Sequence, residues 1–201
     1  MTTSSISHSL FGGAIIASIP TNFADVSSIR QVPDNQEVFL RTDGFTSLTI
    51  DLCERVTYLS SLQAALEYHF SDIVAEGDAK RTYAIDTDIR LPNFPDMAVG
   101  TLMAVVTPPA PTEGRERREN EPKFVVILFA LLRLEQQMTD VTVALNVPCT
   151  PGGPEAAMME VEDVDFERGK YGSVVEEGKE VLGDILRSLE VKDWGMFGPG
   201  G

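Results

Sequence analysis

The histidines and cysteines of this 201-residue sequence, which could bind a metal or act as base and nucleophile, are His8, His69, Cys53 and Cys149. No two of them are spaced as a ligand pair of the kind found in zinc sites. Two cysteines are also too few for a disulfide framework, which favours a reducing compartment. We therefore predict no metal site and no cofactor.

The motifs of the common catalytic sites are also missing from the sequence. His69 is the candidate general base, yet it stands beside Tyr68 and Phe70 in an amphipathic segment, where a packing or solvent-edge histidine is commoner. Cys53 has no basic neighbour in sequence that would activate it as a nucleophile. Residues 172–179 differ from a phosphate-binding loop, because five residues separate the two glycines where four are needed. We predict a protein without catalytic residues of its own.

Carboxylates gather around one predicted hairpin. Asp51 and Glu54 stand at the end of a strongly apolar strand, so a rigid scaffold would hold them. Asp34 and Glu37 lie in the turn and strand before it, and pairing of the two strands could join the four into one acidic face. Such a face suits a basic protein partner. A solvated strand end explains the same spacing.

Hydrophobic periodicity predicts the elements that would position these side chains. Residues 36–41 and 45–54 read as a hairpin connected through Asp43 and Gly44, with Asp51 and Cys53 on the face opposite to the apolar one. Further β segments are predicted at residues 10–20, 81–91, 97–106, 124–134 and 138–147. Amphipathic helices are predicted at residues 60–74 and 173–189, the first capped by Ser60 or Ser61. This order indicates an α+β fold in which an antiparallel sheet of about six strands is sandwiched with helices.

The length and a hydrophobic content of 43% suit one globular domain. We predict a flexible tail at residues 1–9 and a single domain at 10–201. Within it, mobile loops are expected near 107–122, which is rich in proline and charge, and near 149–168.

Charge narrows the class of partner. Acidic residues number 31 against 16 basic ones, and the net charge of −15 would repel nucleic acid and anionic membrane surfaces. A basic protein partner complements this charge, although a negative surface also serves solubility alone. No apolar run approaches the ~18 residues of a membrane span. We predict a monomer that binds neither nucleic acid nor membrane.

Six segments carry a recognisable pattern in this order: LFGGAI (10–15), IRQVPDNQEVF (29–39), IDLCE (50–54), YHFSD (68–72), LLRLEQQMTDV (131–141) and NVP (146–148). Together they resemble the Ran guanine-nucleotide release factor family, the Mog-type Ran-binding nuclear import factors. The resemblance covers most of the chain, but it does not extend to residues 107–122 and 158–167.

The resemblance implies an α+β sandwich like that of the photosystem protein PsbP. It also implies binding to the GTPase Ran and promotion of guanine-nucleotide release, in support of nuclear protein import, with residence in nucleus and cytoplasm. The carboxylates that match the family's Ran-contacting acidic patch are Asp51 and Glu54, and Asp34 and Glu37 look similar to further members of it. The alternative is an adaptor that binds a basic protein without any effect on nucleotide exchange.

Overall fold

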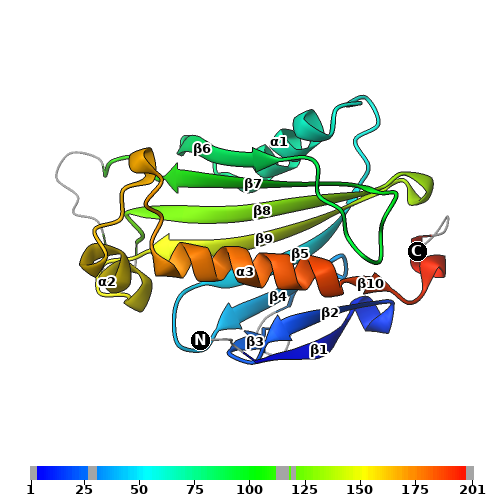
Figure 1. The fold of residues 1–201 in the computed structure, drawn as a ribbon, viewed down its shortest axis with the longest axis horizontal. Coiled ribbons are helices and arrows are strands. Elements are labelled where there is room, and N and C mark those ends of the chain that lie inside the picture. Colours follow the sequence, from blue (N-terminus) through cyan, green and yellow to red (C-terminus); the bar gives the residue numbers. More distant parts are fainter. Residues whose placement is uncertain (1–3, 27–30, 112–117, 119–120, 198–201) are drawn as a thin grey trace.

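The computed structural model describes residues 4–26, 31–111, 118 and 121–197. Its largest element is an antiparallel sheet of seven strands in the order β3-β4-β5-β9-β8-β7-β6 (Figure 1). The strands span β3 Phe23–Asp25, β4 Gln36–Arg41, β5 Ser47–Glu54, β6 Ala79–Asp86, β7 Ala98–Thr107, β8 Phe124–Leu134 and β9 Thr139–Cys149. A second sheet has the order β1-β2-β10, formed by β1 Ser5–Leu10, β2 Ile15–Pro20 and β10 Glu190–Val191. The helices are α1 Leu62–Ile73, α2 Pro154–Val161 and α3 Ser173–Ser188.

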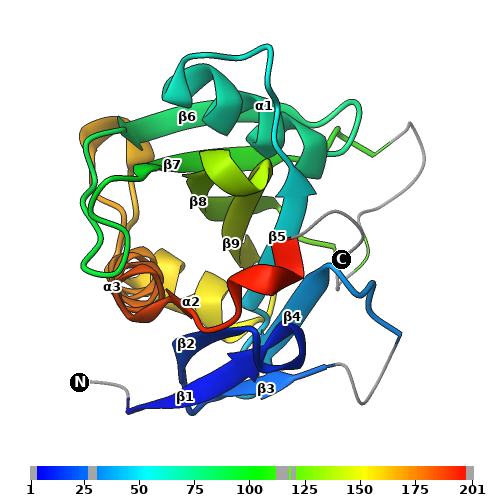
Figure 2. The same cartoon turned by 90° about the vertical axis from the view of Figure 1, so that its right-hand side faces the viewer.

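The large sheet separates two hydrophobic cores, because side chains alternate between its faces. On one face, which we call the α3 face, Leu128 and Val143 pack in one core with Ile185 of α3. On the other, the α1 face, Phe70 of α1 packs against Phe129 of β8 with ring centroids 5.9 Å apart. Figure 2 shows the two helices on opposite sides of the curved sheet.

The predicted α+β architecture is confirmed, and two helices lie where the periodicity placed them. Helix α1 begins after Ser61, whose side chain accepts a hydrogen bond from the Ala64 amide at 3.4 Å. Such a cap satisfies one of the amides that the first helical turn leaves unpaired. Helix α3 buries a stripe that includes Val181 and Ile185. In the described part of the chain the large sheet has seven strands where about six were predicted, and the small sheet of three strands was not expected.

The prediction of a flexible tail at residues 1–9 is wrong from Ser5 onward. Strand β1 pairs antiparallel with β2 from Ser5 opposite Pro20 to Leu10 opposite Ile15. The predicted strand at residues 10–20 is thus a turn followed by the second strand of a hairpin. Gly12, with a φ of 66°, adopts the left-handed conformation that this turn needs.

The segment at residues 149–168 is also more ordered than predicted, because it contains α2. The buried Glu155 of this helix reaches the turn between β4 and β5. Its Oε1 accepts hydrogen bonds from the Phe45 amide at 2.6 Å, the Thr46 amide at 2.9 Å and the Thr46 hydroxyl at 3.0 Å. A Cβ on Gly44 would lie 2.3 Å from this oxygen, so the turn requires glycine there. Most of the other predicted loop, near 107–122, lies outside the described residues.

Candidate functional site

Asp51 lies near the end of β5, where its strand begins to lose a neighbour. It stands opposite Gln36 of β4 and Thr142 of β9, on the α1 face. Because β4 begins at Gln36, the pairing continues through Asn35: its carbonyl accepts a hydrogen bond from the Leu52 amide at 2.9 Å, and its side-chain Nδ2 donates to the Leu52 carbonyl at 3.1 Å. Beyond these contacts the edge of β5 at Cys53 is open on the β4 side.

The Asp51 carboxylate is half-buried, and among the described residues it has one hydrogen-bond donor, which is neutral. Burial raises its pKa above the ordinary value, and the hydrogen bond from Gln36 Nε2 to Asp51 Oδ1, 2.7 Å long, offsets only part of that rise. Among the residues that the structure describes, no lysine or arginine forms an ion pair with it. A desolvated carboxylate in this state gains strongly from a cationic donor on a partner.

The prediction that the four carboxylates form one acidic face is wrong. Glu37 stands opposite Ile50 and therefore lies on the α3 face, where its Oε1 accepts a hydrogen bond from the Phe11 amide at 2.5 Å. Glu54 is exposed at the strand end, three residues after Asp51, so alternation directs it to the opposite face. Asp34 is exposed in the turn before β4. A partner that contacts both Asp51 and Glu54 has to reach around the open edge of β5.

A buried ionic network that the sequence did not reveal lies beside this edge. Asp140 Oδ1 accepts a hydrogen bond from Arg133 Nε at 3.1 Å, and its Oδ2 lies 2.9 Å from His69 Nε2. The same Oδ2 accepts a hydrogen bond from the Val56 amide at 3.2 Å. Arg133 also donates to the carbonyls of Val56 at 2.7 Å and Leu59 at 2.8 Å. The network therefore fixes the loop that follows β5.

The network keeps its members charged. Burial alone would lower the pKa of His69, but hydrogen bonding to Asp140 and Cys53 outweighs it and raises that pKa to about 9. Burial alone would raise the pKa of Asp140, but its bonds with His69, the Val56 amide and Arg133 lower it. His69 is a packing residue, as the sequence suggested, and at neutral pH it is an imidazolium.

Two exposed tyrosines extend from the loop and helix that this network holds. Tyr58 is 73% exposed and Tyr68 of α1 is 40% exposed, and their rings meet edge to face with centroids 6.2 Å apart. The Tyr68 ring also lies against His69 at 5.6 Å. Tyrosine is enriched where proteins bind tightly, because it offers a large contact at small entropic cost. We call Asp51, Glu54, Tyr58 and Tyr68 together the β5-end surface.

Within the described ranges, no three His, Cys, Asp or Glu side chains are grouped so as to hold a metal ion. Nor does any helix there have the length and apolar content to cross a membrane.

A rigid α+β sandwich with carboxylates and exposed aromatic rings at one strand end has the features of a protein-binding module. The chain belongs to the family described as Ran-interacting Mog1 protein, whose model matches residues 8–148. It is 31% identical to the Ran guanine nucleotide release factor of Bos taurus, over 94% of this chain and 95% of that protein. It is 32% identical to the nuclear import protein MOG1 of Saccharomyces cerevisiae, over 70% of this chain and 65% of that protein.

The solved structures agree with this assignment. The crystal structure of the Saccharomyces cerevisiae Ran-binding protein Mog1p superposes with a TM-score of 0.73 at 26% identity, over 98% of this chain and 100% of that chain. A glutamate-to-alanine mutant of the protein Mog1 superposes with a TM-score of 0.70, over 97% of this chain and 100% of that chain. The family resemblance noted in the sequence is thereby confirmed.

Proposed function

We propose that this protein binds the GTPase Ran and promotes release of guanine nucleotide from it, in support of nuclear protein import. Family membership supports the proposal, since relatives that match nearly their whole length are named Ran guanine nucleotide release factors. The observation that carries it in this chain is Asp51, a half-buried carboxylate whose pKa is raised and whose one hydrogen-bond donor is neutral. Such a group is poised for a cationic or backbone donor of a partner.

Release requires no bond to be broken. A protein that binds nucleotide-free Ran more tightly than loaded Ran weakens nucleotide binding by the same factor, because coupling between two ligands is reciprocal. In our proposal, Asp51 and Glu54 engage donors near the phosphate site of Ran and compete with phosphate oxygens for them. Asp51 is already partly desolvated in the free protein, so the desolvation cost of this carboxylate on binding is smaller.

The remaining carboxylates have smaller parts in this proposal. Asp34 is exposed and adds negative potential beside the open edge of β5, which speeds encounter with a basic surface. Glu37 accepts a hydrogen bond from the Phe11 amide, in the turn between β1 and β2, and so mainly positions that hairpin against β4. We further propose that the protein is a monomer of nucleus and cytoplasm, that it binds no nucleic acid, and that it supplies no catalytic residue to GTP hydrolysis.

The test follows labelled nucleotide leaving Ran. Purified protein is mixed with Ran carrying fluorescent GTP, and faster loss of the label than from Ran alone is expected. The Asp51→Ala, Glu54→Ala double variant should abolish the acceleration. A matched variant, Glu76→Ala with Glu180→Ala, removes two exposed carboxylates elsewhere and changes the net charge equally, so it should retain the acceleration.

Each contrary result has a definite meaning. Binding without release would support the adaptor, and absence of binding would overturn the assignment of Ran as partner. If the site variant and the matched variant lost the acceleration of release equally, overall charge, and not Asp51 and Glu54, would determine binding.

A further inference from the structure

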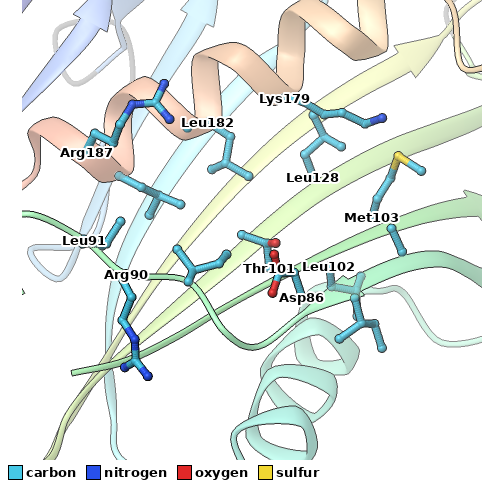
Figure 3. A pocket seen from close by; sticks show the side chains of 15 residues that line it. Asp86, Arg90, Leu91, Thr101, Leu102, Met103, Leu128, Lys179, Leu182 and Arg187 are labelled. Carbon is cyan, nitrogen blue, oxygen red and sulfur yellow. The ribbon is translucent and has the colours of Figure 1, made fainter. Parts of the chain in front are cut away.

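A cavity of about 380 Å³ opens between α3 and the strands β6 and β7, on the α3 face and away from the β5-end surface. Helix α3 packs on β8 and β9, and the cavity lies beside it toward β7 and β6 (Figure 3). The walls of the cavity are mainly apolar and include Met103, Leu128, Leu182, Leu186, Ile89 and Leu91. This size and lining lie within the range of small-molecule sites in proteins.

The residues that line the cavity carry a net positive charge, whereas the whole chain is strongly negative. Arg90, Lys179 and Arg187 line it, and among the described lining residues Asp86 is the only acidic one. The whole chain has 16 basic residues against 31 acidic ones, so the lining is richer in basic residues than the chain as a whole. In Figure 3 Lys179 and Arg187 extend from α3, and Arg90 lies across from them on the segment after β6.

These cations already have partners, but weak ones. Arg187 pairs with Asp184 at 2.6 Å and Lys179 with Glu176 at 2.8 Å, each within one turn of α3. Arg90 is paired only loosely, at 3.4 Å from Asp88. Exposed pairs of this kind contribute little, so an anion in the cavity can share or replace them.

One glycine of α3, Gly183, lies in the wall of the cavity. At Gly178, a Cβ would lie 2.8 Å from Leu128 Cδ1, so close packing on the sheet requires glycine. At Gly183, which lines the cavity, the nearest atoms to a Cβ all belong to the flexible guanidinium of Arg187, the closest at 3.0 Å. Glycine inside a helix is destabilising relative to alanine. Core packing therefore does not require glycine at position 183.

We propose that this cavity binds a medium- to long-chain carboxylate, a ligand with an apolar tail and one anionic head. The tail lies against Met103 and Leu182, and the head lies at the rim of the cavity, where the flexible side chain of Arg90 or Arg187 can turn toward it. This inference is independent of Ran binding, because the cavity and the β5-end surface are formed by different strands.

The experiment titrates the full chain with decanoate by calorimetry, and in parallel with decyltrimethylammonium, which has the same tail and a cationic head. Decanoate should bind at least tenfold more tightly than the cation. The Arg90→Gln, Arg187→Gln variant should bind decanoate at least tenfold more weakly. A control with the same change of charge, Lys170→Gln with Lys192→Gln, lies outside the cavity and should leave the affinity for decanoate unchanged.

A second variant tests whether decanoate binding needs the volume of the cavity. Gly183→Leu fills the cavity from the helix and should abolish decanoate binding while the urea unfolding midpoint is retained or rises. Decanoate binding that survives Gly183→Leu, that is matched by the cation, or that is absent from the unmodified protein would overturn the proposal.

Discussion

Asp51 and Asp140 lie on the same face of the sheet, on the neighbouring strands β5 and β9, and both are withdrawn from water. Their surroundings nevertheless act on them in opposite directions. Burial raises the pKa of Asp51 and the hydrogen bond from Gln36 offsets only part of that rise, whereas the pKa of Asp140 is lowered by bonds that outweigh its burial. The difference is the presence of Arg133 and His69 beside Asp140.

The comparison shows that burial alone does not distinguish a structural carboxylate from a binding one. The two oxygens of a carboxylate accept about four hydrogen bonds. Asp140 receives its donors from within the protein, and these bonds join β8, β9, α1 and the loop after β5. Asp51 receives one donor and keeps capacity for a partner. We infer that a half-buried carboxylate with hydrogen-bonding capacity to spare, beside one whose two oxygens are both bonded within the protein, marks the partner-binding site.

The largest effect should come from removing the satisfied carboxylate. Asp140→Ala leaves Arg133 and His69 buried without their counter-charge, and the loss of one member of a buried pair typically costs about 3–5 kcal/mol. Urea unfolding followed by circular dichroism would measure this as a lower midpoint. Asp51→Ala is the matched truncation on the same face. If the two variants lost equal stability, the contrast between the two carboxylates would be wrong.

The second effect concerns pH and reports on the same network. The folded-state pKa of His69 is about 9 against an ordinary 6.5, so its contribution is complete below pH 6.5 and is lost as pH rises to about 9. Counting the whole rise, this amounts to roughly 3 kcal/mol. Unfolding free energies at pH 6, 7.5 and 9.5 should fall more steeply for the unmodified protein than for His69→Gln. Parallel curves would show that His69 is not held as an imidazolium.

Much of the fold was predictable because its signals are local. The apolar stripe of α3 and the serine cap of α1 follow from residues one turn apart. Strand β1 was missed because three of its six residues are serines, Ser5, Ser7 and Ser9, and only Ile6 and Leu10 are apolar. Helix α2 was missed for a different reason: Glu155 is satisfied by amides more than a hundred residues away in sequence.

The site was predictable only in part. The end of an apolar strand at Asp51 and Glu54 was correctly located, and strand alternation by itself places these two on opposite faces. Pairing of Gln36 with Asp51 depends on register, which the sequence does not determine. The network of His69, Arg133 and Asp140 joins three separate elements, so no local sequence spacing predicts it.

The smallest effect on stability, with the clearest effect on binding, is expected from Asp51→Asn. Because the folded-state pKa of Asp51 is raised, its ionised form disfavours folding above its unfolded pKa, and a neutral amide removes that cost. The unfolding free energy at neutral pH should therefore stay within about 0.5 kcal/mol or rise. Affinity for Ran, measured by calorimetry, should fall at least tenfold, or about 1.4 kcal/mol. Retained affinity with reduced stability would make Asp51 a second structural carboxylate and would move the binding site elsewhere.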